Sequence, residues 1–454
     1  MIIKSKPQTS ASEISLVRRL GLFDATMIVM GGIIGSGIFI NPYVVAQEVH
    51  STVLILGAWA FGGLIALAGA FIYAELSSQS SASGGQYVYL REAFHPSLAF
   101  IYGWALLLVI QTGGMAAVAV TFAKYLVELG GTQASDTRAA VVAAVALALL
   151  TIINCFGVRA GSTTQNVFMV LKLIAIAALV IFGLTVTAAP RSEAMTMSAA
   201  SSPTIWHALT AFGAALIPVQ FAYGGWQTAC FVAGEVREPR KTLPRGLLLG
   251  VLAVIVVYLA VNFVCVHALG PEGLARTKTP ASAVMRLALG ERGARLIAAG
   301  IAISTIGFLS QSMLTAPRVY FAMAEDGLFF RALARLNSER VPAFAIALQG
   351  ALAIIIVFWG RYEQILNYVV SVDVVFFALT AACVFAFRRR QTNKSNEVFR
   401  IPGHPFTTLF FIAACCAVVF STVYHHLSNS AIGLVIMLAG LPVYFLWSMR
   451  KDSL

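Results

Sequence analysis

Long apolar runs separated by short polar and charged clusters recur along the whole chain of 454 residues. Each run has about twenty residues, enough for a helix to cross a hydrocarbon core of about 30 Å. At that length only a helix satisfies its own backbone hydrogen bonds in lipid. The pattern therefore predicts an all-α membrane protein with 12 transmembrane helices, near 24–47, 53–77, 97–127, 139–156, 164–188, 205–232, 246–269, 293–323, 343–360, 364–387, 405–425 and 430–449.

The composition agrees with this pattern. Hydrophobic residues make up 59% of the chain and charged residues only 11%, with a mean hydropathy of +0.84. A soluble domain carries roughly 25% charged residues, so a water-soluble fold of this length is excluded. The first twenty residues hold no apolar core of signal-peptide length, and we expect the first helix to be retained.

The distribution of positive charge predicts the orientation. An even number of spans places both termini on one side, and the predicted loops on that side carry 21 of the 31 Lys and Arg residues against nine on the other side. The positive-inside rule therefore predicts cytoplasmic termini, residues 1–20 and 450–454, around one transmembrane domain, residues 21–449, in the inner or plasma membrane. The net charge of +12 is then an orientation signal rather than a nucleic-acid surface.

Cysteine and histidine patterns indicate no catalytic or metal chemistry. All six cysteines lie inside or at the ends of apolar runs without a CxxC pair, which argues against a disulfide framework and a zinc site. No HExxH or GxSxG motif occurs, although an intramembrane enzyme would need such a metal site or a Ser/His pair. We expect no enzyme activity, no catalytic residues, no cofactor and no metal.

Glycine interrupts the first predicted helix at mid-membrane depth, in the segment GGIIGSGIF from Gly31 to Phe39. Each glycine weakens a helix by about 1 kcal/mol relative to alanine. An unwound segment would expose the amides of Gly35, Ser36 and Gly37 in front of a half-helix, which suits a carboxylate. The alternative is close helix packing, because Gly31 and Gly35 also form a GxxxG pair.

The sixth predicted helix repeats this anomaly, with Pro218 followed by FAYGGWQ from Phe221 to Gln227. Paired glycine interruptions in corresponding positions of two halves indicate a transporter's binding site. The two interruptions are five spans apart, as an inverted repeat of five plus five helices requires. Together they favour a site over packing alone.

Three ionisable residues fall within or beside apolar runs. Lys172 lies inside the fifth helix, where a lysine is costly enough to suggest function, although its long stem also allows its head to reach the interface. Asp373 lies in the tenth helix, where we favour a structural hydrogen-bonded role over proton relay. Glu75, near the end of the second helix, is expected to face the cytoplasmic boundary.

These residues resemble the amino acid-polyamine-organocation superfamily, and most closely its L-type amino acid transporter branch. The resemblance is carried by GGIIGSGIF, by FAYGGWQTACFVAGEVREPRKTLPRG, by Lys172 and by TAPRVYFAMAEDGLFF from Thr315 to Phe330. It implies a LeuT-like fold with broken helices 1 and 6, in which two inverted repeats of five helices, about residues 21–190 and 205–390, precede helices 11 and 12, about residues 405–449.

The resemblance also implies a substrate site. Ile33, Ser36 and Gly37 are expected to hold the α-carboxylate through backbone amides and the serine hydroxyl. The carbonyls of Phe221, Ala222 and Gly224 are expected to take the α-ammonium, with the Phe221 ring acting as a lid. Gln227 falls where family members vary residues that touch the substrate side chain.

Lys172 matches the mid-helix lysine of the family, which implies sodium-independent exchange. Its ammonium is expected to replace the sodium ion of coupled relatives and to bond carbonyls of helices 1 and 8. Animal L-type transporters carry an external cysteine that links a heavy subunit, whereas the segment from Lys124 to Arg138 has none. We therefore expect no disulfide-linked partner.

The sequence thus favours alternating-access exchange of neutral L-amino acids. Proton-coupled symport stays open, as does a cationic amino acid or polyamine carrier, which would want carboxylates near the breaks. A non-transporting amino acid sensor on the same fold is a further alternative, although no appended signalling domain is visible in the chain.

Overall fold

The structure, a computed structural model, describes residues 19–80, 82, 84–130, 135–156, 162–187, 205–339, 341–390 and 398–451. The predicted terminal segments therefore lie outside the described residues, apart from residues 19, 20, 450 and 451. The elements are α1 (Leu22–Ile33), α2 (Gly37–Val49), α3 (Thr52–Gln79), α4 (Gln86–Ala93), α5 (Pro96–Ala105), η1 (Leu106–Ile110), α6 (Gln111–Leu129), α7 (Asp136–Cys155), α8 (Ser162–Gly183), α9 (Ile205–Tyr223), α10 (Thr228–Phe231), η2 (Ala233–Glu235), α11 (Pro239–Arg276), α12 (Pro280–Thr315), α13 (Pro317–Glu325), η3 (Arg331–Ala334), α14 (Ala343–Trp359), α15 (Tyr362–Arg390), α16 (Phe406–His425) and α17 (Leu427–Lys451).

The described part of the chain is helical throughout, with a single isolated β-bridge between Leu20 and Val236. Eleven helical segments of this part are long and apolar enough to cross a membrane, when α1 with α2, α5 with η1 and α6, α9 with α10, and α12 with α13 each count as one segment. The helix α14 is also apolar but has only 17 residues. The prediction of an all-α membrane protein is confirmed.

Two helices extend well beyond the apolar runs that predicted them. The helix α11 covers residues 239–276 against a predicted 246–269, and α12 starts at residue 280 against a predicted 293. Gly270 and Gly290, each with φ of 67°, interrupt the helical geometry there. Glycine adopts such positive φ values without steric cost, so the chain turns and continues as a more polar helix that a hydropathy pattern misses.

The outer helices present apolar side chains to their surroundings. On α7, Val141, Val145 and Leu149 are spaced four residues apart and are 49%, 54% and 56% exposed. Residues at this spacing share one helix face. A half-exposed stripe of branched aliphatic residues is suited to lipid, and it marks this face of the bundle as membrane-facing.

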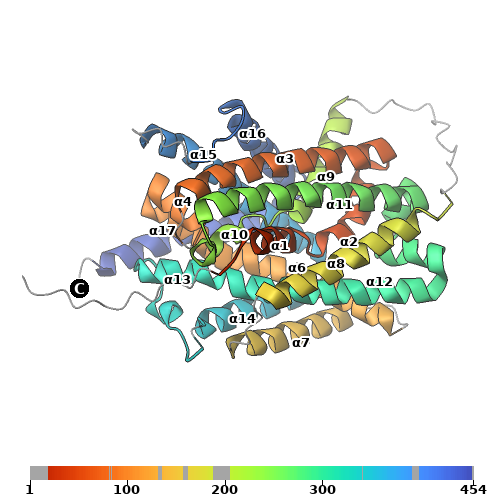
Figure 1. Cartoon of the computed structure of the whole chain (residues 1–454), viewed down its shortest axis with the longest axis horizontal. Helices are drawn as coiled ribbons and strands as arrows, with labels where there is room; N and C mark the ends of the chain where they lie inside the picture. Colours follow the sequence, from red (N-terminus) through yellow and green to blue (C-terminus); the bar gives the residue numbers. More distant parts are fainter. Residues whose placement is uncertain are drawn as a thin grey trace, which may run out of the picture.

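The interrupted first span lies inside the bundle. The short α1 runs through the middle, with α11 along one side and α12 along the other, and α3 packs against α11 (Figure 1). The helix α2 packs against α9, so the second half of the first span contacts the first half of the sixth. This arrangement brings both glycine-rich interruptions to the centre of the fold.

A group of ion pairs ties the helices together at the end of the bundle where the described chain starts and stops. Glu75 accepts two hydrogen bonds from Arg388, at 2.7 and 2.6 Å, and one from the amide of Ile401 at 2.8 Å. Arg318 pairs with Glu235 at 2.6 Å. Glu75 thus lies toward the end of the bundle where it was expected, but it is 0% exposed and does not face solvent: it holds α3 to α15.

Candidate functional site

A central pocket lies between the two interruptions and has a volume of about 90 Å³. One water molecule needs roughly 10–15 Å³ of such space, so the pocket has room for a small polar solute. Its lining comes from α1, α2, α6, α9, α10, α12 and α15 and from both interruptions. The residues predicted for the site that line it are Ile33, Gly35, Ser36, Gly37, Phe221, Gly224 and Gln227.

The first interruption supplies backbone amides. The helix α1 ends at Ile33, and α2 starts at Gly37 after Ser36. The Gly35 amide already donates to the Ile33 carbonyl at 2.8 Å, whereas the amides of Ser36 and Gly37 have no partner among the described residues. The Ile33 amide belongs to the hydrogen-bond ladder of α1. Two of the four predicted amide donors therefore remain for an anion.

The serine hydroxyl at this interruption is buried beside Tyr362. Ser36 is 1% exposed, and its side chain interacts with the Tyr362 hydroxyl, which itself donates to Oδ1 of Asn41 at 2.8 Å. A serine hydroxyl can rotate to serve another partner. Together with the two amides and the N-terminal end of α2, this hydroxyl makes the interruption suited to a carboxylate.

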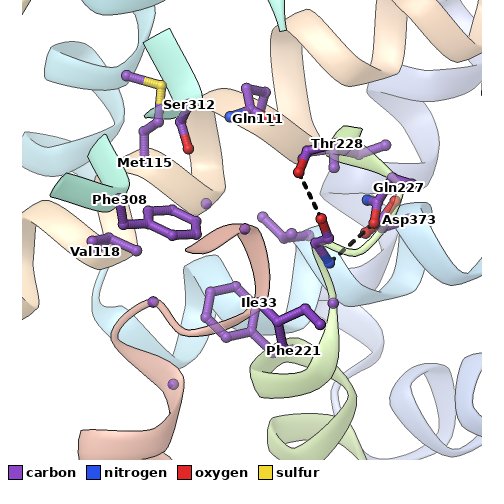
Figure 2. A pocket seen from close by; sticks show the side chains of 18 of the residues that line it. Ile33, Gln111, Met115, Val118, Phe221, Gln227, Thr228, Phe308, Ser312 and Asp373 are labelled. Atoms are coloured by element: carbon purple, nitrogen blue, oxygen red, sulfur yellow. Dashed lines mark hydrogen bonds between the residues drawn. The ribbon is translucent and has the colours of Figure 1, made fainter. Parts of the chain in front are cut away.

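The second interruption is a tight turn that uses its own polar side chains. Gly225 has φ of 117°, a conformation that glycine adopts readily. The Gly225 amide donates to Oε1 of Gln227 at 3.0 Å, and Oγ1 of Thr228 donates to the Gly225 carbonyl at 2.8 Å (Figure 2). The Gln227 oxygen thus holds the turn, although the residue also lines the pocket as expected.

The two interruptions touch through glycine. A Cβ on Gly225 would lie 2.1 Å from the Gly32 carbonyl oxygen, and a Cβ on Gly37 would lie 2.7 Å from Cα of Ala222. Neither position tolerates a side chain. The first interruption is therefore both unwound and closely packed. The glycines that permit the close packing are Gly32, Gly37 and Gly225, and not the predicted pair of Gly31 and Gly35.

Phe221 and Ala222 have different surroundings. The Phe221 ring lies at the pocket beside Ile33 (Figure 2). It packs edge-on against the Tyr362 ring, with the ring centroids 6.3 Å apart. Ala222 does not line the pocket, and its carbonyl accepts a hydrogen bond from the Tyr258 hydroxyl at 3.1 Å. The geometry therefore leaves the carbonyls of Phe221 and Gly224 as the better ammonium acceptors.

Tyr258 was missed by the sequence reasoning. Its hydroxyl also lies 3.0 Å from the Ile33 carbonyl, so one buried group on α11 reaches both interruptions. No motif marks this tyrosine, because it lies in a continuous apolar run far along the chain from either interruption. Only the packing of α11 against α1 and α2 reveals it.

Lys172 sits beside the pocket rather than in its lining. It is 3% exposed, and its ammonium donates to the carbonyl of Ile34, between the pocket residues Ile33 and Gly35. In this conformation the head does not reach the membrane boundary. The expected contact with helix 1 is present. The expected contact with helix 8, which is α12 here, is not: the described residues of α12 accept no hydrogen bond from the ammonium. The helix α12 instead contacts α1 through Gln311, which donates a hydrogen bond to the Ile28 carbonyl.

Asp373 on α15 lines the pocket. Its Oδ1 is buried without a hydrogen-bond partner among the described residues. The sequence favoured a structural hydrogen bond for Asp373, but Oδ1 makes none with the described residues. The sequence marks the carboxylate as unusual at membrane depth, but it does not reveal that α15 turns this face toward the pocket.

A second cavity, of about 630 Å³, opens near the end of the bundle away from the Glu75–Arg388 and Glu235–Arg318 ion pairs. It is lined by Lys124, Lys278, Arg361 and Glu363 among other residues, and by Tyr362. Tyr362 also contacts Phe221, so an aromatic pair lies between this cavity and the central pocket. The cavity is thus placed as a vestibule to the pocket on the side opposite the termini.

A pocket between two interrupted membrane helices is the arrangement of secondary transporters. Residues 20–441 match the amino acid permease family, and the chain belongs to this family, within the amino acid-polyamine-organocation superfamily. It is 30% identical to a serine/threonine exchanger of Bacillus subtilis, over 96% of this chain and 98% of the relative. It is also 30% identical to the mouse large neutral amino acids transporter small subunit 2 (97% and 84%) and 29% identical to the mouse b(0,+)-type amino acid transporter 1 (87% and 81%).

The predicted superfamily and branch are confirmed by these relatives, which by their names are transporters or exchangers rather than enzymes. The chain is accordingly a multi-pass membrane protein of an amino acid transporter family. Among the described residues, no group of three His, Cys, Asp or Glu side chains is placed to hold a metal ion.

Proposed function

We propose that this protein exchanges neutral L-amino acids across the cell membrane by alternating access, without sodium. The observation that carries the proposal is the central pocket, which is enclosed by both interrupted spans and has the Lys172 ammonium on the carbonyl of Ile34 behind it. In this proposal the Lys172 ammonium supplies the positive charge that a bound sodium ion supplies in sodium-coupled transporters.

Each end of a zwitterion has a counterpart in the pocket. The amides of Ser36 and Gly37 with the serine hydroxyl receive the α-carboxylate, and the carbonyls of Phe221 and Gly224 receive the α-ammonium. Ile33, Gly35 and Gln227 also line the pocket. Bound substrate therefore contacts both interruptions at once, so its arrival or departure biases the two halves together.

The proposed architecture has twelve spans, with spans 1–5 and 6–10 as inverted repeats and α16 and α17 outside them. The matching interruptions of α1–α2 and α9–α10 support this symmetry. We place both termini in the cytoplasm from the Lys and Arg distribution. The segment from Lys124 to Arg138 has no cysteine for a linked heavy subunit, so we propose transport by this chain without one.

Counterflow in proteoliposomes tests the function. Vesicles loaded with one neutral amino acid should take up labelled amino acid rapidly, empty vesicles should not, and replacing sodium with choline should leave the rate unchanged. Uptake into empty vesicles driven by a proton gradient would instead establish proton symport. Failure of every amino acid to support counterflow would overturn the proposal.

A further inference from the structure

The central pocket has two chemically different walls (Figure 2). Met115, Val118 and Phe308 lie on one side together with Ser312, whereas Thr228, Gln227 and Asp373 lie on the other side, and Gln111 lies between them. The polar wall, which carries Asp373, comes from two separate parts of the chain, namely the turn into α10 and α15. Such convergence of polar groups in a membrane-embedded pocket is typical of a ligand contact.

On the polar wall, Asp373 has an unused acceptor. The Gln227 oxygen and the Thr228 hydroxyl are already bonded to Gly225, as described above. Oδ1 of Asp373 is buried and has no partner among the described residues. A carboxyl group keeps at least one acceptor oxygen whether it is ionised or protonated. This wall therefore needs a hydrogen-bond donor that the described protein does not supply.

No cation among the described residues is paired with Asp373. The groups that interact electrostatically with it are the phenols of Tyr73 and Tyr102 and the thiol of Cys415. In the ion pairs of the described residues, Asp373 has no Lys, Arg or His partner. An unmet acceptor of this kind costs free energy that a donor on the ligand recovers.

The charges near the pocket indicate which donor fits. The Lys172 ammonium lies behind the first interruption, and Asp373 is the acidic residue of the pocket lining. A zwitterion adds no net charge between these two groups, whether or not the carboxyl is ionised. A substrate with a cationic side chain would add a net positive charge in low-dielectric surroundings, which is unfavourable.

We propose that Asp373 receives the side chain of the substrate and selects neutral amino acids whose side chain ends in a hydroxyl or amide donor, over aliphatic and aromatic ones. This inference rests on the proposed exchange function and names its substrate class. A substrate without the donor leaves the Asp373 oxygen unsatisfied in the occupied pocket.

Isosteric substrate pairs test the inference in counterflow. Threonine and valine have nearly the same shape, as do serine and 2-aminobutyrate, and only the first of each pair carries a donor. We expect wild-type protein to prefer threonine over valine, and serine over 2-aminobutyrate, by about tenfold, as the cost of leaving a buried acceptor unsatisfied implies. Equal competition by both members of a pair overturns the inference, while counterflow itself still supports exchange.

Two variants assign the preference to Asp373. Asp373→Leu removes the acceptor and should bring the threonine-to-valine ratio close to one, with alanine exchange as the reference for folded protein. Asp373→Asn keeps the shape of the side chain with a weaker, neutral acceptor and should lower the threonine-to-valine ratio a few-fold. This variant provides the result if Asp373→Leu does not fold. An unchanged threonine-to-valine ratio in Asp373→Asn contradicts the assignment. So does a wild-type protein that prefers lysine over threonine and loses this preference in Asp373→Asn, because Asp373 would then select cationic rather than neutral donors.

Discussion

The ammonium of Lys172 on α8 donates a hydrogen bond to the carbonyl of Ile34, the residue that follows the last turn of α1. An interrupted helix leaves its final carbonyls without partners, and in the membrane no water replaces them. The buried lysine therefore satisfies the end of the half-helix and ties α8 to the substrate pocket. Its position argues against a head that reaches the membrane boundary.

We expect Lys172→Ala and Lys172→Met to bind substrate but to exchange it about tenfold more slowly or worse, because a hydrogen bond from a charged group stabilises by roughly 1.5–3 kcal/mol. Lys172→Met is the critical variant, since it keeps the apolar stem and loses only the charge. Substrate binding and counterflow are measured on the same purified protein. A methionine variant with wild-type exchange would leave the coupling role without support.

The anion site gives a second expectation. Ser36→Leu should abolish uptake because its bulk fills the space between the free amides, whereas Ser36→Ala should raise KM only a few-fold by removing one hydroxyl. Gly37→Val should also abolish uptake, since its Cβ would lie 2.7 Å from Cα of Ala222 and would push the two interruptions apart. Uptake is normalised to the amount of protein in the membrane, and normal affinity in Ser36→Leu or Gly37→Val would refute the site.

The sequence predicted the parts of this site that are local. Glycine at Gly35 and Gly37 weakens α1 whatever surrounds it, so the first interruption is visible in the composition. A lysine within an apolar run is likewise conspicuous, and Lys172 does lie beside that interruption. Helix positions also followed from apolar length alone, because lipid permits few alternatives to a spanning helix.

The parts that were missed depend on contacts between distant segments. Tyr258 and Asp373 become important only because α11 and α15 turn those faces toward the pocket, and Ala222 turns its carbonyl to Tyr258 instead of the pocket. The burial of Glu75 was not foreseen, because it depends on Arg388, 313 residues further along the chain. The ion pair with Arg388 offsets the free-energy cost of removing the Glu75 carboxylate from water. Single-sequence patterns carry no information on such pairings.

Phe221 gives a third expectation. Its ring lines the pocket and meets Tyr362, which also lines the vestibule, so we expect it to close over bound substrate. Phe221→Ala should raise KM several-fold and slow exchange. Phe212→Ala is the matched control, because Phe212 lies on the same helix and contacts the Phe61 ring at 6.2 Å but does not line the pocket. Equal kinetic effects of the two variants would argue against a lid.

The Tyr258 hydroxyl gives the last expectation, since it lies within hydrogen-bond distance of carbonyls in both interrupted spans. If this hydroxyl keeps the two interruptions in register, Tyr258→Phe should slow exchange on the order of tenfold, the effect of leaving a buried acceptor unsatisfied. Tyr223→Phe is the control, because that hydroxyl bonds the carbonyl of Trp59 on α3, which belongs to neither interruption, while the Tyr223 ring packs against the Tyr258 ring with the centroids 5.0 Å apart. The control should change thermal stability more than exchange rate.

A double-mutant cycle of Tyr258→Phe with Lys172→Met separates a coupling role from simple loss of stability. The two side chains bond neighbouring carbonyls, those of Ile33 and Ile34, so they act on the same end of α1. Groups that share one structural element give non-additive effects, whereas independent losses add within about 0.5 kcal/mol. We therefore expect the double variant to exchange little more slowly than the slower single variant. Additive losses would mean that the two side chains stabilise the fold separately and do not work together at the interruption.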